Sequence, residues 1–169
     1  MITSPENRQR FEKKEILVKG ITEPGAAVTY RDRTATIGDD GKWQIRVLLE
    51  SGRNRITVTA TDAAGNSAQD SVIVFYIPPD VAAFSANAKF GSCEFDPPYD
   101  IYFGEGEPNS QVFITSEFGN GQTTVNGEGT WEVQVFFPEA PYGETFLVRA
   151  TDEFGRSKAF EFVSYAGGV

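Results

Sequence analysis

The chain contains two near-copies of one short segment, about ninety residues apart. Residues 59–68 read TATDAAGNSA and residues 149–158 read RATDEFGRSK. A repeated catalytic motif would be unusual, whereas a repeated turn indicates that one fold occurs twice in the chain. The repeat therefore constrains the fold more than any other feature of the sequence.

The similarity extends upstream of the repeated segment. GITEPGAAV (20–28) matches GEGEPNSQV (104–112), and DDGKWQIRV (39–47) matches GEGTWEVQV (127–135). The offset between matched residues rises from 84 to 88 and then to 90. This drift indicates small insertions in the loops of the second copy, where changes in length disturb a fold least.

Composition changes between the two copies. Up to Tyr76 there are 11 Lys/Arg and 10 Asp/Glu, and from Ile77 onward there are 4 and 14, so the net charge changes from +1 to −10. Two of the 14 Phe precede residue 77 and twelve follow it. Both changes occur near IPPD (77–80), so we predict two domains, 1–77 and 78–169.

Alternation of apolar and polar residues dominates both copies. RITVTATD (55–62), KWQIRVLL (42–49) and TWEVQVFF (130–137) each place apolar residues at every second position. This pattern, rich in β-branched and aromatic residues and bounded by Gly, Asp and Asn, predicts half-buried antiparallel strands. Several short strands with turn signals at regular spacing predict an all-β sandwich in each copy.

These motifs resemble the bacterial immunoglobulin-like domains, which include the glucodextranase-type accessory domain and the repeats of large bacterial surface adhesins. The matching residues in the first copy are Gly20 to Val28, then Asp40 to Trp43, then Gly52 to Asn66. The resemblance covers nearly all of residues 1–76. It implies two tandem immunoglobulin-like antiparallel β-sandwich domains, as in an extracellular or bacterial cell-surface module of structural or adhesive type.

The second copy follows the pattern less closely. Asn109 stands where the first copy has Gly25, and Arg156 stands where it has Asn66. These departures weaken any ligand site that the family would imply at these positions, but they do not weaken the prediction of the fold.

The residue inventory argues against catalysis. The chain has no His and one Cys, Cys93, so it lacks Ser–His–Asp and Cys–His chemistry, the commonest zinc ligand and an internal disulfide. The acidic second half repels phosphate, so we expect no nucleic-acid partner. No apolar run approaches the roughly 20 residues that span a bilayer. We expect a non-enzymatic protein.

The repeated segments have two interpretations. Asp62 with Gly65, and Asp152 with Gly155, can close a tight turn between two strands, since Asp accepts backbone hydrogen bonds and Gly adopts positive φ. Calcium is the alternative, because carboxylate and amide oxygens are ligands of that ion. The residues considered for such a site are Asp39, Asp40, Asp62 and Asn66. We favour the turn and expect no cofactor.

Proline marks a second pair of turns. In EPG, Pro24 presets φ and Gly25 supplies flexibility behind it; Pro108 occupies the same place in EPN of the second copy. We therefore predict tight turns at both sites.

Aromatic residues divide into core and contact candidates. Trp43 and Trp131 each begin an alternating strand and are predicted to pack in the core. Tyr99, Tyr102 and Phe103 stand among prolines and acids, which suits contact with carbohydrate or protein, and equally an inter-domain seam.

We therefore expect a structural or adhesive tandem module that acts as spacer, stalk or assembly surface. Its partners would be other domains of a larger protein, and a cell-surface glycan or protein. Two alternatives stay open: a carbohydrate-binding accessory region of a polysaccharide-active enzyme, and a phage or appendage fibre domain.

Overall fold

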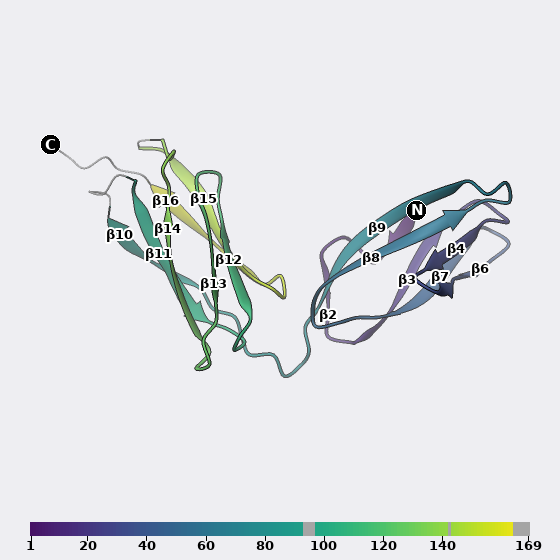
Figure 1. The fold of residues 1–169 in the computed structure, drawn as a ribbon, viewed down its shortest axis with the longest axis horizontal. Helices are drawn as coiled ribbons and strands as arrows, with labels where there is room; N and C mark the ends of the chain where they lie inside the picture. Colours follow the sequence, from purple (N-terminus) through teal and green to yellow (C-terminus); the bar gives the residue numbers. More distant parts are fainter. Residues whose placement is uncertain (93–96, 142, 164–169) are drawn as a thin grey trace. The chain divides into compact units, whose positions relative to one another are not determined.

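The structure, a computed structural model, describes residues 1–92, 97–141 and 143–163 (Figure 1). These residues form strands and turns, so the fold is all-β as predicted. Two compact units divide the chain, unit 1 from Met1 to Pro79 and unit 2 from Asp80 to Val169. The predicted boundary after residue 77 lies two residues before this division. Within the described ranges, no helix is long and apolar enough to cross a membrane.

Unit 1 is a sandwich of two sheets. Across the first sheet the strands are β1 (Ile2–Ser4), β3 (Glu15–Ile21), β7 (Lys42–Leu48) and β6 (Thr36–Ile37). Across the second they are β2 (Gln9–Phe11), β9 (Ser67–Tyr76), β8 (Gly52–Thr61), β4 (Ala27–Tyr30) and β5 (Arg33–Thr34). The pairing of β2 with β9 is parallel and the other pairings are antiparallel.

Unit 2 repeats this plan. Its first sheet contains β10 (Asn87–Ser92), β11 (Tyr99–Glu105) and β14 (Thr130–Phe136). Its second contains β13 (Asn120–Thr124), β12 (Gln111–Thr115), β15 (Thr145–Asp152) and β16 (Ser157–Val163). In both units the strand order matches the two sheets of an immunoglobulin-like sandwich, and the predicted fold class is confirmed.

The cores lie between the sheets and follow the predicted alternation. Every second residue of β3 and β7 is buried, from Ile16 to Gly20 and from Trp43 to Val47. In unit 2 the rings of Phe137, Phe146 and Phe162 pack with centroids 4.6 to 5.2 Å apart. This aromatic core explains part of the phenylalanine excess of the second copy.

The strand register is the same in the two units in one sheet and different in the other. Gly20 lies opposite Trp43, and Gly104 lies opposite Trp131, so the pairing of β3 with β7 matches that of β11 with β14 residue for residue. In the second sheets the two copies differ: in unit 1 Val28 lies opposite Ala60, whereas in unit 2 Val112 lies opposite Asp152. Because Asp152 corresponds to Asp62, β12 has moved by two residues along β15 towards the β15–β16 turn. We call this difference the register slip.

Candidate functional site

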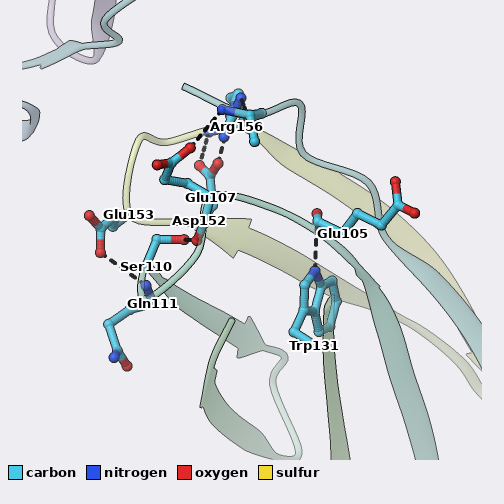
Figure 2. A network of polar contacts seen from close by, with 9 residues as sticks. Glu105, Glu107, Ser110, Gln111, Trp131, Asp152, Glu153 and Arg156 are labelled. Carbon is cyan, nitrogen blue, oxygen red and sulfur yellow. Dashed lines mark hydrogen bonds and ion pairs between the residues drawn. The ribbon is translucent and has the colours of Figure 1, made fainter. Parts of the chain in front are cut away.

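A network of polar contacts surrounds the β15–β16 turn of unit 2 (Figure 2). The Asp152 carboxylate accepts a hydrogen bond from the Arg156 backbone N–H at 2.8 Å and forms an ion pair with Arg156 Nε at 2.6 Å. The Asp152 side chain is 1% exposed and that of Arg156 20%. The turn therefore contains a charged pair largely removed from water.

Arg156 also fixes the segment that leads into unit 2. Its Nη1 donates to the carbonyl of Ala82 at 2.8 Å, and the backbone N–H of Ala82 donates to the Glu107 carboxylate at 2.7 Å. The guanidinium lies over the rings of Phe84 and Phe154, 6.0 and 5.3 Å from their centroids. We call this set, Ala82, Phe84, Glu107, Asp152 and Arg156, the entry clamp.

The entry clamp continues into the core through Phe84. The ring of Phe84 stacks on that of Trp131, with centroids 6.0 Å apart and an interplanar angle of 5°. The Trp131 indole N–H donates to the carbonyl of Glu105 at 3.3 Å (Figure 2). The segment before β10 is thus held by one cation, one carboxylate and one aromatic stack.

The register slip explains why the turn of unit 2 needs an arginine. It sets β12 against the turn, so that Gln111 and Glu153 exchange hydrogen bonds of 2.9 and 3.0 Å and Val112 lies opposite Asp152. Burial raises the pKa of Asp152, while the hydrogen bond and positive charge of Arg156 oppose that rise. An ionised carboxylate in this place requires a paired cation.

The matching turn of unit 1 is simpler and more exposed. Asp62 Oδ1 accepts hydrogen bonds from the N–H groups of Ala64 and Asn66, at 2.9 and 2.8 Å, and Oδ2 accepts from the Asn66 side-chain amide at 2.8 Å. Gly65 has φ of +90°, and Gly155 in the other turn has +77°. Both segments are therefore turns in which the Asp side chain accepts backbone hydrogen bonds.

These bonds predict a pH-dependent contribution of Asp62 to the stability of unit 1. The hydrogen bonds from Asn66, first from its side chain and then from its backbone, lower the pKa of Asp62. The carboxylate therefore stabilises the fold above the unfolded-state pKa of about 3.9, and this contribution is lost as pH falls through the lower folded-state value. Asp62→Asn should reduce the Tm of unit 1 at pH 7, and this reduction should shrink as pH approaches 2.

The measurement is thermal unfolding between pH 7 and 2, with unit 1 followed by the NMR signal of the Trp43 indole. Asp39→Asn, which removes the same charge from an exposed loop of unit 1, is the control. A Tm difference for Asp62→Asn that stays constant across this range would contradict the assignment.

The four residues considered for calcium do not form one group. Asp62 and Asn66 close one turn, whereas Asp40, in the β6–β7 turn, pairs with Lys42 at 2.6 Å. Asp39 precedes Asp40 in that second turn. Across the described ranges, no three acidic, His or Cys side chains lie where they could together bind a metal ion. We expect equal Tm values in calcium and in chelator, a prediction that thermal unfolding checks.

The three predicted contact aromatics lie on β11. Tyr102 is 0% exposed and packs in the core against Phe160, with ring centroids 5.5 Å apart. Its place in the contact set is therefore corrected: it corresponds to the buried Val18 of unit 1 and cannot touch a partner. Tyr99 and Phe103 are half-buried on the opposite face of the strand.

Phe103 borders an open groove of about 700 Å³ on unit 2. Asn87 and Glu132 lie beside it on neighbouring strands, and Lys89 Nζ lies 5.4 Å from its ring centroid. The remaining lining includes Asn126 and several threonine hydroxyls. The groove thus combines two aromatic residues, Phe103 and Trp131, with polar groups that donate and accept hydrogen bonds.

The other predicted residues occupy turns and cores. Gly25, after Pro24, has φ of +84°; after Pro108, Asn109 has φ of +67°. Trp43 and Trp131 are 3% and 4% exposed. Cys93 lies outside the described residues.

Sequence reasoning missed three residues that organise unit 2. The sequence shows Arg156 only as a departure from Asn66, and it gives no signal for Phe84, which lies three residues before the first strand of unit 2. Asp100, 8% exposed, lies where unit 1 has Ile16, and burial raises its pKa while the Gly91 N–H donates to it at 3.1 Å. Alignment of the two copies places Asp100 at the inward-facing position of Ile16, and this alignment predicts that Asp100 is buried.

Comparison with known proteins supports the resemblance for unit 1. Residues 1–76 match the family model described as Glucodextranase, domain B, an immunoglobulin-like domain. Bacillopeptidase F of Bacillus subtilis (strain 168) is 33% identical over 75 residues, which are 43% of this chain and 5% of that protein. The chain therefore spans a small part of the curated relative that it matches.

Solved structures of tandem modules are also similar. A tetra-tandem repeat in the extending region of a large adhesion protein has a TM-score of 0.36 at 19% identity, over 95% of this chain and 46% of that one. The fibronectin(III)-like modules of Clostridium thermocellum CbhA give 0.37 at 13%, over 98% and 94%. The Yersinia pseudotuberculosis adhesin InvE gives 0.37 at 13%, over 96% and 57%.

Proposed function

We propose that this chain is a non-enzymatic tandem of immunoglobulin-like domains that serves as a spacer, stalk or assembly surface in a secreted or cell-surface bacterial protein. The match of unit 1 to an accessory domain, and the repetition of the same sandwich in unit 2, support this role. The partners would be neighbouring domains of a larger protein.

The entry clamp is the observation that carries the proposal. A spacer transmits force through the segments that join its domains. A joining segment that makes few contacts with its domain detaches and unfolds before the rest of that domain. Here the segment before β10 is tied to unit 2 by the Arg156 and Glu107 hydrogen bonds, and Lys158 Nζ donates to the carbonyl of Ala86 at 2.8 Å. These contacts suit a domain that bears load at its entry.

Pulling the whole chain from its two ends tests the proposal. We expect two discrete unfolding events, with unit 2 releasing about 30 nm of chain, since an extended residue spans about 3.3 to 3.6 Å and Asp80–Val169 contains 90 residues. Gradual extension of unit 2 at low force would contradict a load-bearing role.

The groove beside Phe103 supports a second function, carbohydrate binding by an accessory region. Phe103 offers a ring for stacking, and the amides, hydroxyls and carboxylates beside it offer the polar groups that fix the orientation of a ligand. Retention of the chain in polysaccharide-containing gels would support this function, provided that Phe103→Ala abolishes it. Phe113→Ala is the matched control, because Phe113 is 37% exposed on β12. Equal retention of both variants would exclude the groove.

A further inference from the structure

Strand β14 is an open edge of its sheet. In the described part of the chain its strand partner is β11, and β13 belongs to the other sheet. Successive residues of an antiparallel strand direct their backbone groups to alternate sides. Thr130 directs its groups away from β11, since its N–H donates to the Asn126 side chain and its carbonyl accepts from the Asn126 N–H. Glu132 and Gln134 therefore do the same, and no described residue pairs with their backbone groups.

The matching edge of unit 1 is covered by a strand. There β6 pairs with β7, and Thr36 lies opposite Gln44, which corresponds to Glu132 of unit 2. Burial of the core differs in the same sense. Ile45 is 6% exposed, whereas its counterpart Val133 is half-buried although it packs against the core. Unit 2 thus leaves open an edge that unit 1 covers.

The path of the preceding strand explains this difference. In both units a turn with the same hydrogen bonds leads into the strand, at Gly38 in unit 1 and at Asn126 in unit 2. Before this turn, the chain of unit 1 crosses to the first sheet as β6. In unit 2 it does not cross, because the Val125 N–H donates to the carbonyl of Ser110 at 2.9 Å. The segment therefore stays beside β12 and leaves β14 uncovered.

The open edge adjoins the groove of about 700 Å³ that Phe103 borders. Two carboxylates, those of Glu105 and Glu132, line this groove, and its described lining has no lysine or arginine. Lys89 reaches Glu132 from β10, at 2.8 Å. From residue 77 onward the chain has 4 Lys/Arg against 14 Asp/Glu. A strand added at this edge would therefore meet an excess of negative charge.

We propose that the edge of β14 receives an added strand, an extended segment of a partner protein that carries a basic side chain and pairs with Glu132 and Gln134. Main-chain hydrogen bonds hold a segment added in this way. The residue opposite Glu132 places its side chain on the outer face, beside that carboxylate and the groove. Complementary charge favours a basic segment over an acidic one. The proposal rests on the assembly-surface role proposed above, and it names the surface and the partner.

The probe is a capped peptide, Arg-Thr-Ala-Thr-Ile-Gly, the sequence of residues 33–38, because this segment covers the matching edge of unit 1 and carries one positive charge. Amide hydrogen exchange of the whole chain is measured by NMR, with and without millimolar peptide. In the free chain, Glu132 and Gln134 should exchange much faster than Trp131 and Val133, whose amides face β11. The peptide should slow exchange at Glu132 and Gln134 by a factor of 1 + [peptide]/Kd, at least about twofold.

Two matched peptides control for the backbone pairing and for the charge. One carries an N-methyl group on the residue that corresponds to Thr36, which removes a backbone donor and keeps every side chain. The other has Glu in place of Arg. Both should slow exchange at Glu132 and Gln134 less than the probe does. Equal effects of the three peptides, or no effect of the probe, would overturn the proposal.

Three other results would also overturn it. The first is slow exchange at Glu132 and Gln134 in the free chain at low concentration. The second is protection that grows with chain concentration together with a doubled mass in sedimentation, which would make a second copy the occupant. The third is a response of the Phe103 signals to polysaccharide without a response of the edge to the probe. The pulling experiment is independent, since two discrete unfolding events without peptide binding would retain the spacer role and remove this partner site.

Discussion

Replacing Arg156 with alanine is expected to lower the free energy of unfolding of unit 2 by about 3 to 5 kcal/mol. The change leaves the Asp152 carboxylate, 1% exposed, without its ion pair. It also removes the hydrogen bond to the Ala82 carbonyl and the contacts with Phe84 and Phe154. Urea unfolding followed by the NMR signal of the Trp131 indole measures the loss.

Two comparisons separate this effect from the loss of any surface arginine. Arg149→Ala removes an exposed side chain whose Nη1 donates to the Ser157 hydroxyl at 3.3 Å, and should change stability by less than about 1 kcal/mol. Asp152→Asn combined with Arg156→Ala should recover part of the loss, because no buried charge is then left alone. Equal effects of Arg149→Ala and Arg156→Ala would contradict the entry clamp.

Replacing Trp131 with alanine is expected to lower the free energy of unfolding of unit 2 by about 3 to 5 kcal/mol, the usual range for a buried large aromatic. Trp131 is 4% exposed, and its loss leaves a cavity in the core and removes the stack with Phe84. Urea unfolding followed by the NMR signals of unit 2 amides measures this change.

Trp43→Ala is the matched variant in unit 1, since Trp43 is 3% exposed and holds the same position in the strand register. Trp43→Ala should lower the free energy of unfolding of unit 1 by less than Trp131→Ala lowers that of unit 2. The difference should be about 0.5 to 1.5 kcal/mol, the range for one aromatic pair. A loss of less than about 1 kcal/mol at either position would contradict core packing of the tryptophans.

Much of the fold could be predicted because strand alternation states which side chains face inwards. The buried positions of β3 and β7 follow the pattern read from the sequence. The tryptophans and the turns at Asp62 and Asp152 could also be identified, because local chemistry determines them.

The contact aromatics show where local reasoning failed. Tyr99, Tyr102 and Phe103 were grouped because they stand close together in the chain beside prolines. In a strand, neighbouring residues point to opposite faces, so Tyr102 enters the core while Phe103 lies on the outer face. Alignment of Tyr102 with Val18, an inward-facing residue of the first copy, distinguishes Tyr102 from the outward-facing Tyr99 and Phe103.

The sequence by itself determined that one sandwich occurs twice, which residues of each strand face the core, and where the main turns lie. Only the tertiary structure decided the register slip between β12 and β15. A slip of two residues keeps every side chain on its original face, so the alternation read from the sequence is unchanged. The slip nevertheless sets β12 against the turn at Asp152, and there Arg156 ties the turn to the segment entering unit 2.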